Sequence, residues 1–410
     1  MDACGSKKQD FLAVFTNQRV KCAIMTSSIK TNSNRAYISG KVLVKTLDSF
    51  AFEHRDIYTC GGLIVNDISH RKCEVIDCSG KILFPAFFNM HVHLGENMFR
   101  DISGENWTIR DYLDYTNSVQ EKMSVHEREK MWERSANEVI KSLNDNFTVG
   151  FCAGRAVYSL PIRDHAVMSA YPLMEGKKLE HFIKSGIDGF LAYRRQNITE
   201  HCHVGIILHS VYMNHENSLL LAKECLEQEE SFLVVHVAED KFTSSLEHER
   251  YGMSGIRVLD KYGLLTENTI LVHCGCASPE DLELVSSSGA TIAICPISNR
   301  FLNTVPPNIT FLNQYRIPWF LCTDGVATGR SLSLFEQAAE LKKLYPTIQY
   351  SELYDSITLR PAKIYKNSFY TGRLASNTVA RFLISDDLHV APEKFLESIF
   401  KQKNKCRFVM

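Results

Sequence analysis

Two histidines stand one residue apart at the end of an apolar run, in the segment LFPAFFNMHVHLGENMFRD of residues 83–101. Side chains at positions i and i+2 of a strand point to the same face, so His91 and His93 can bind the same ion. A single histidine at such a place is more often a core or rim residue than a ligand. The pair is therefore a candidate metal site that needs further ligands from elsewhere in the chain.

Other residues with metal-binding side chains also end apolar runs. They are His209 in VGIILHS, His236 in FLVVHVAE, His273 in TILVHC and Asp324 in PWFLCTD. Added to the first pair, His236 and Asp324 supply a third neutral nitrogen and a carboxylate. This set suits one catalytic Zn²⁺, or Fe²⁺, that keeps a position open for water. The remaining histidines, such as His126 and His248, are scattered, and we expect them on the surface.

The elements that position these residues form a regular series. Eight short apolar runs, rich in β-branched residues, alternate with longer charged and amphipathic segments; the runs cover residues 82–93, 148–154, 165–174, 204–210, 232–239, 269–274, 291–298 and 318–324. Continuous apolar runs indicate strands that are covered on both faces, and the segments between them are typical of the covering helices. The pattern predicts a closed parallel (β/α)8 barrel of the TIM type, with a doubly wound open sheet as the alternative. In such a barrel the carboxyl ends of the strands meet, so the candidate residues share one site.

Composition excludes several other classes of function. The net charge is −1 and no long block of Lys or Arg occurs, which predicts neither nucleic acid nor membrane partners. The start of the chain has no apolar segment of signal-peptide length, so we expect a cytoplasmic protein. The 13 cysteines are scattered through apolar runs, which is typical of reduced, buried thiols. A small molecule is the expected partner.

Five ordered motifs resemble the amidohydrolase superfamily. They are FPAFFNMHVHL, VVHVAED, VHCGCASPEDL, CPISNRFL and CTDGVATGRSLSLFEQ, and the similarity runs in register from about residue 62 to residue 386. Within the superfamily they look like the metal-dependent aminohydrolase branch, which includes cytosine, guanine and S-adenosylhomocysteine deaminases and the triazine hydrolases. The resemblance implies a barrel flanked by a small β-sandwich from both chain ends. We expect residues 1–81 plus 368–410 to form the sandwich domain and residues 82–367 the barrel.

The resemblance also implies roles for individual residues. His91, His93, His236 and Asp324 match the family's metal ligands. Glu239, three residues after His236, matches the acid that shuttles protons, while His273 matches the histidine that polarises the attacking water or the leaving group. His209 matches a histidine that touches substrate. Binuclear members have a carboxylated lysine in the fourth strand, and HVGIILHS holds no lysine, so one metal ion is expected.

The chain departs from the family's pattern in two places. Pro85-Ala86 stands where Pro-Gly is usual, and Gly325 and Thr328-Gly329 replace the usual Ser and Asn after the last Asp. We expect neither departure to touch a ligand, but both to line regions that shape the pocket. The substrate of any single family member therefore cannot be transferred to this chain.

The expected reaction is hydrolytic deamination of an amino-substituted heterocycle. A bound divalent ion lowers the pKa of water from nearly 16 to about 7. Asp324 can accept the proton of that water, and Glu239 can pass a proton to a ring nitrogen and then to the departing amine. Hydrolysis of a cyclic amide, an imide or another C–N or C–Cl bond is the alternative on the same fold. A catalytically silent scaffold is a third hypothesis, which the full set of ligands disfavours.

Candidate substrate contacts follow four of the predicted strands. Residues 95–116 form a long loop plus a helix, a typical lid at the top of a barrel. Besides His209, we expect Arg100, Trp107, Arg155, Ser298 and Asn299 to contact substrate. No glycine-rich phosphate cradle occurs, which favours a nucleobase, nucleoside or related ring over a nucleotide. A homodimer is expected, with residues 1–35 adding to the small domain or to the dimer contact.

Overall fold

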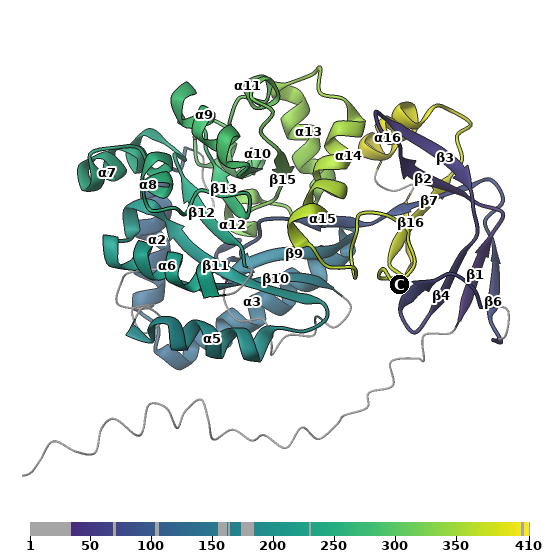
Figure 1. The fold of residues 1–410 in the computed structure, drawn as a ribbon, viewed down its shortest axis with the longest axis horizontal. Helices are drawn as coiled ribbons and strands as arrows, with labels where there is room; N and C mark the ends of the chain where they lie inside the picture. The colour runs from purple at the N-terminus through teal and green to yellow at the C-terminus, as the bar shows by residue number, and fades with distance from the viewer. Residues whose placement is uncertain are drawn as a thin grey trace, which may run out of the picture.

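The computed structural model describes residues 34–68, 71–102, 106–154, 162, 165–173, 184–228, 231–402 and 406–409. Its larger part is a ring of eight parallel strands in which each strand is hydrogen-bonded to the next along the chain (Figure 1). The strands are β8 (Phe87–Asn89), β9 (Thr148–Gly154), β10 (Ala166–Pro172), β11 (Cys202–Ser210), β12 (Leu233–Val237), β13 (Thr269–His273), β14 (Thr291–Ile294) and β15 (Trp319–Leu321). The predicted (β/α)8 barrel is therefore confirmed, and the open-sheet alternative is wrong.

Helices cover the outside of the ring, as the amphipathic segments predict. They are α2 (Ile109–Glu121), α3 (Val125–Asp145), α5 (Gly186–Asn197), α6 (Glu216–Gln228), α7 (Lys241–Tyr251), α8 (Gly255–Lys261), α9 (Pro279–Ser288), α10 (Pro296–Phe301), α11 (Ile309–Gln314), α12 (Val326–Gly329), α13 (Leu334–Leu344), α14 (Tyr350–Ser356) and α15 (Leu359–Tyr365), with the 3-10 turns η1 (Glu96–Phe99) and η2 (Val211–Met213). The sequence fixes where helix α9 begins, because Ser278 and Asp281 form a capping box at its N-terminus. Most of the chain between β9 and β10 lies outside the described residues, so a helix there stays a prediction.

The first apolar run, predicted as one strand over residues 82–93, is two strands in different sheets. Strand β7 (Lys81–Pro85) pairs antiparallel with β16 (Phe382–Asp386) outside the barrel, whereas β8 pairs with β9 inside it. The chain changes sheet at Pro85-Ala86, where the Tyr370 hydroxyl donates a hydrogen bond to the Ala86 carbonyl. Both strands are buried on both faces, so the apolar run itself does not mark the change.

Side chains and the backbone just after the two strands close the ring between β15 and β8. The Asn89 amide donates to the Thr323 hydroxyl over 2.6 Å and accepts from the Thr323 backbone over 3.3 Å. One residue further, the Asp324 backbone N–H donates to the His91 carbonyl over 3.2 Å. These bonds bring Asp324 beside His91, although the two residues end the last and the first strands of the barrel.

The smaller part of the structure is a β-sandwich built from both ends of the chain (Figure 1, purple and yellow strands). One sheet has the order β17-β16-β7-β2-β3 and the other the order β5-β4-β1-β6. Their further strands are β1 (Arg35–Ile38), β2 (Lys41–Lys45), β3 (Phe50–His54), β4 (Ile57–Cys60), β5 (Leu63–Val65), β6 (Glu74–Asp77) and β17 (Arg407–Val409). Helix α16 (Pro392–Lys401) packs Phe395 on Phe52 of β3, with 5.5 Å between ring centroids. The predicted flanking sandwich is confirmed.

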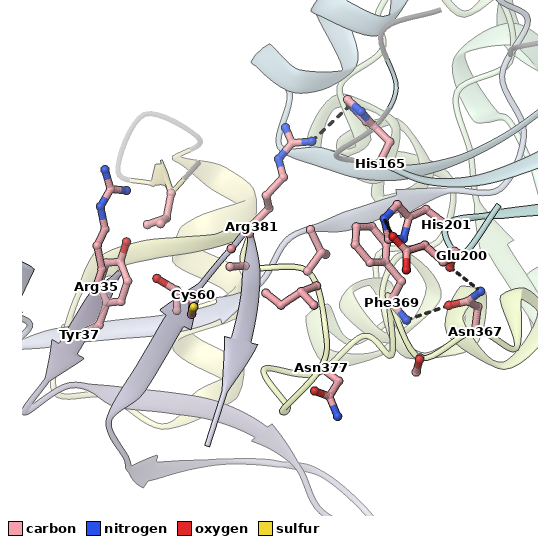
Figure 2. Close-up of a pocket in the computed structure, with 18 of the residues that line it drawn as sticks. Arg35, Tyr37, Cys60, His165, Glu200, His201, Asn367, Phe369, Asn377 and Arg381 are labelled. Atoms are coloured by element: carbon pink, nitrogen blue, oxygen red, sulfur yellow. Dashed lines mark hydrogen bonds and ion pairs between the residues drawn. The ribbon is translucent and has the colours of Figure 1, made fainter. Parts of the chain in front are cut away.

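A cavity of about 480 Å³ lies where the sandwich meets the start of the barrel strands. Figure 2 shows Arg381, just before β16, reaching toward His165, which precedes β10. The Arg381 guanidinium donates to His165 over 3.4 Å and also to Asn144. His201 and Phe369 also line this cavity, with 3.7 Å between their ring centroids. This junction joins the sandwich to the barrel at the end remote from the carboxyl ends of the strands.

Two further predictions concern the whole chain. Every cysteine that the structure describes is free, as the scattered pattern predicts. Among the described helices, none is both long enough and apolar enough to cross a membrane.

Candidate active site

Four predicted metal ligands meet at the carboxyl end of the barrel. His91 and His93 follow β8, His236 lies in β12 and Asp324 follows β15. The Nε2 atom of His91 lies 3.0 Å from that of His93 and 3.2 Å from that of His236. The Asp324 Oδ1 atom lies 3.3 Å from His91 Nε2 and 3.0 Å from His93 Nε2. One atom from each residue thus lies within 4.8 Å of all the others, and we call these four residues the metal cluster.

The metal cluster fits the ion that the sequence predicts. Three imidazole nitrogens and one carboxylate oxygen are a ligand set that suits Zn²⁺ or Fe²⁺ and leaves a coordination position for water. Mutually close imidazole nitrogens in a buried place are unfavourable unless a cation or protons lie between them. Burial, followed by the neighbouring histidine charges, holds the pKa of His236 well below its usual value, so its ring is neutral, as a ligand must be.

Hydrogen bonds on the far ring nitrogens orient the ligands. His236 Nδ1 donates to the His209 carbonyl over 2.6 Å, so the proton of the neutral ring sits there and the Nε2 lone pair faces the cluster. His93 Nδ1 lies 3.1 Å from Glu96 Oε1 in η1. Asp324 is held as well, because its Oδ2 atom accepts hydrogen bonds from Ser298 over 2.6 Å and from Thr328 over 3.1 Å.

The backbone at these strand ends has an uncommon conformation. His209, Ala238, His273 and Asp324 all have positive φ, at 55°, 48°, 75° and 62°. Left-handed backbone is disfavoured for residues with a β-carbon, and it clusters at functional sites. These four residues lie at or just after the carboxyl ends of β11, β12, β13 and β15, where the candidate site is.

A carboxyl–imidazole pair lies beside the metal cluster. Glu239 Oε1 lies 3.2 Å from His273 Nε2, and the Asn299 amide N–H donates to His273 Nδ1 over 3.4 Å. Since an amide nitrogen only donates, Nδ1 is the accepting nitrogen and the ring proton sits on Nε2, facing Glu239. Burial lowers the pKa of His273 to about 4, so the ring is neutral.

The surroundings of Glu239 favour the neutral form of its carboxyl group. Its pKa is raised well above the usual value, first by burial and then by the charges of Asp324 and Asp240. Its side chain is 12% exposed, so it can still reach a bound molecule. A protonated carboxyl next to an imidazole N–H donor is an arrangement that can give a proton to a substrate and stabilise negative charge.

The residues predicted to contact substrate have different positions. His209 lies with its ring 4.9 Å from the His236 ring, at the edge of the metal cluster. Ser298 and Asn299 are buried and bonded to Asp324 and His273, so the structure shows them orienting those two groups. Their predicted contact with substrate stays a prediction.

Arg100 and Trp107, from the predicted lid, contact residues outside the metal cluster. Arg100 is largely exposed beside Asp101, at 3.7 Å. Trp107 packs against Tyr115 of α2, with 5.7 Å between ring centroids, and its carbonyl accepts from Asn303. Arg155 lies outside the described residues. The roles of Arg100, Trp107 and Arg155 in binding therefore stay predictions.

One expectation about the departures from the family pattern is wrong. The Thr328 hydroxyl bonds directly to the ligand Asp324, and Gly325 packs against Glu96, which in turn contacts the ligand His93. Sequence reasoning also missed Glu96 itself. Its position three residues after His93, on the same turn of chain, is the signal that could have found it.

Comparisons with known proteins agree with this geometry. The sequence signature of the amidohydrolase family matches residues 82–410. The 5-methylthioadenosine/S-adenosylhomocysteine deaminase of Acetivibrio thermocellus is 26% identical over 274 residues, which are 64% of this chain and only 62% of that protein. Guanine deaminase from E. coli has a similar structure, with a TM-score of 0.77 and 15% identity over 92% of this chain and 99% of that one. An adenosine deaminase from Xanthomonas campestris with bound zinc has a TM-score of 0.74 and 16% identity over 89% and 88% of the two chains.

Proposed function

This chain belongs to the amidohydrolase family, and we propose that it is a metal-dependent hydrolase that releases the amino group of a heterocyclic substrate as ammonia. The observation that carries this proposal is the Glu239–His273 pair beside the metal cluster. A hydrolase needs an attacking water, and a deaminase also needs a proton donor for the ring and for the leaving amine. The metal cluster would hold the ion that activates the water, and Glu239 would be the proton donor.

The ion would be held by His91, His93, His236 and Asp324. When bound, Zn²⁺ or Fe²⁺ supplies the acidity that turns water into hydroxide near neutral pH. Zinc is the first choice because the structurally similar adenosine deaminase contains it. The site has one cluster of this kind among the described residues, which supports a single ion.

The protein's own groups then move protons. Asp324 accepts the proton of the attacking water, while Glu239 gives its proton to the ring nitrogen next to the amino-bearing carbon. The carbon thereby becomes electrophilic, and an oxygen–carbon bond forms. His273 Nε2–H faces the developing negative charge, which such donors typically stabilise by about 3 kcal/mol. Ionised Glu239 then takes the proton of the new hydroxyl group and gives it to the amine, so the carbon–nitrogen bond breaks, ammonia leaves and the hydroxyl oxygen becomes a carbonyl. The proton held by Asp324 returns to Glu239, which restores the starting state.

The substrate class follows from the absence of a phosphate cradle in the sequence and from the relatives' names. The proteins compared above are deaminases of 5-methylthioadenosine/S-adenosylhomocysteine, of guanine and of adenosine. We therefore propose an aminopurine, as free base or nucleoside, as the first class to test. Aminopyrimidines and pterins are the second class.

Ammonia release tests the proposal directly. The zinc-loaded and iron-loaded proteins are incubated with aminopurines, adenine nucleosides, aminopyrimidines and pterins, and the variant Glu239→Gln serves as the blank. Ammonia formed by the wild type and abolished in the variant supports deamination. A hydrolysed product without ammonia would instead support the alternative, hydrolysis of a cyclic amide, an imide or another leaving group.

A further inference from the structure

Glu96 lies beside the metal cluster but has no role in the proposed reaction. Its Oε1 atom lies 3.1 Å from His93 Nδ1, on the side of the ring away from the cluster. Its Oε2 atom is buried and makes no hydrogen bond of ordinary geometry with the described residues. The hydroxyl of Tyr112 from α2 is also buried without such a bond, and it lies near the Glu96 carboxyl group. A buried carboxyl group is costly unless it is paired, and the His93 ring is the partner that the structure gives Glu96.

Gly325 makes the space for this carboxyl group. A β-carbon built on Gly325 would overlap Oε2 of Glu96 and would lie too close to its carboxyl carbon. The backbone of Gly325 does not require glycine, since its φ of −72° and ψ of 152° are open to any residue. The glycine at this position is therefore explained by the approach of Glu96.

The backbone that carries Glu96 is firmly held. The Asn97 backbone N–H donates to the Ser135 hydroxyl of α3 over 2.9 Å, and that hydroxyl donates to the Leu94 carbonyl over 2.8 Å. The Asn97 side chain also bonds to Glu138. Turn η1 is thus fixed to the longest helix of the barrel, and Glu96 meets His93 from a rigid support.

We propose that Glu96 is a positioning residue that orients His93 and strengthens it as a metal ligand, and that Gly325 is required because it admits the Glu96 carboxylate. This inference rests on the proposed function only for the role of His93 as a ligand. A carboxylate that accepts the far N–H of a ligating histidine fixes the ring and increases its donor strength. Loss of such a partner typically weakens metal binding or activity about 10–100-fold.

The test is a double-mutant cycle read out as zinc affinity, so it needs no substrate. Zinc dissociation constants are measured by chelator competition for the wild type, Glu96→Ala, Gly325→Ala and the double variant, with exposed Glu283→Ala as the control for loss of a carboxylate. We expect Glu96→Ala and Gly325→Ala each to raise the constant about 10-fold or more. In the double variant we expect no increase beyond that of Glu96→Ala, because the new β-carbon then has nothing to displace.

A conservative variant separates positioning from packing. Glutamine in place of Glu96 keeps the shape and an accepting oxygen but loses the charge, so we expect Glu96→Gln to bind zinc more tightly than Glu96→Ala and less tightly than the wild type. The inference is overturned if folded Glu96→Ala binds zinc like the wild type, or if Gly325→Ala weakens binding as much in the Glu96→Ala background as it does alone. If Gly325→Ala alone fails to fold, recovery of folding in the double variant supports the inference, and failure of both overturns it.

Discussion

At the scale of single residues, three histidines of the site are held by a hydrogen bond on the ring nitrogen that faces away from the reaction. His236 donates to a backbone carbonyl, His93 faces Glu96, and His273 accepts from Asn299. For His236 and His273, whose pKa values are lowered by burial, the bond selects one tautomer of a neutral ring and therefore decides whether the inner nitrogen is a lone pair or a donor. His236 presents a lone pair, whereas His273 presents its N–H.

Glu239→Gln tests the proton shuttle. The amide keeps the size of the side chain but cannot give a proton, and it lies outside the metal cluster. We expect the variant to retain bound metal and to lose turnover by at least about 100-fold, the usual scale of acid–base catalysis. Metal content by elemental analysis and the turnover number are the measurements. Full activity of this variant would show that another group transfers the proton.

Asn299→Leu tests how His273 is oriented. Without the amide donor, the ring is free to place its proton on Nδ1 and to offer Glu239 a lone pair. We expect a loss of kcat of about 100-fold, as when one oxyanion donor is removed, with KM and metal content little changed. An unchanged kcat in a correctly folded variant would mean that Glu239 alone fixes the ring.

The metal cluster could be predicted from sequence because each of its residues stands at the end of an apolar run, and strand ends meet in a barrel. The residues that contact these ligands could not be predicted from the sequence. Glu96 and Gly325 are far apart in the chain, and only their close approach shows why one is an acid and the other a glycine. Ser298 is predicted from the sequence as a substrate contact, and no local pattern shows that it and Thr328 donate hydrogen bonds to Asp324.

At the scale of elements, the apolar runs predict where strands lie but not to which sheet each belongs. Strands β7 and β8 share one apolar run, and both are buried, yet one pairs with the C-terminal strand β16 and the other with β9. Strands β7 and β8 are both apolar and almost fully buried, so neither property separates them. The change of sheet depends on partners that come nearly at the other end of the sequence, which no local pattern contains.

The junction between the sandwich and β10 should respond to acid. Burial, followed by the charge of Arg381, lowers the pKa of His165 to about 3. Below pH 6.5 the unfolded chain protonates this residue and the folded chain does not, so the free energy of unfolding falls by about 1.4 kcal/mol per pH unit from this group alone. This loss continues until the pH approaches 3.

His165→Gln removes that contribution. We expect urea unfolding at about pH 6.5 and about pH 5 to show a smaller difference in free energy for this variant than for the wild type. The matched control is His126→Gln, which changes an exposed histidine on α3. If the two variants have the same pH dependence, His165 does not titrate in the way its burial indicates.

At the scale of the whole molecule, the metal cluster joins the first, fifth and eighth strands of the barrel. An ion bound there connects β15 with β8, the two strands between which the ring closes. It binds only the folded chain. We expect a chelator to lower the melting temperature and Zn²⁺ to restore it; free zinc at about 100 times its dissociation constant adds about 2.7 kcal/mol. Differential scanning calorimetry measures this effect. His91→Ala should abolish the response to zinc, and a response as large as that of the wild type would contradict the assignment of the ligands.

Three predictions about the whole chain await their own tests. The division into a sandwich of residues 1–81 plus 368–410 and a barrel of residues 82–367 stays a prediction, and β7, which pairs with β16, extends past that boundary. The homodimer and the cytoplasmic location also stay predictions. Sedimentation and localisation of the tagged chain would test these two.

The sandwich has a consequence for how the protein is made. Strand β7 ends at Pro85, and its partner β16 begins at Phe382, so a ribosome adding about 5–20 residues per second needs about 15–60 s to supply the partner. During that time the newborn chain carries an apolar strand with an unpaired edge, which is the feature most prone to pair with a neighbouring chain. We therefore expect translation speed and holding chaperones to affect the yield of this protein.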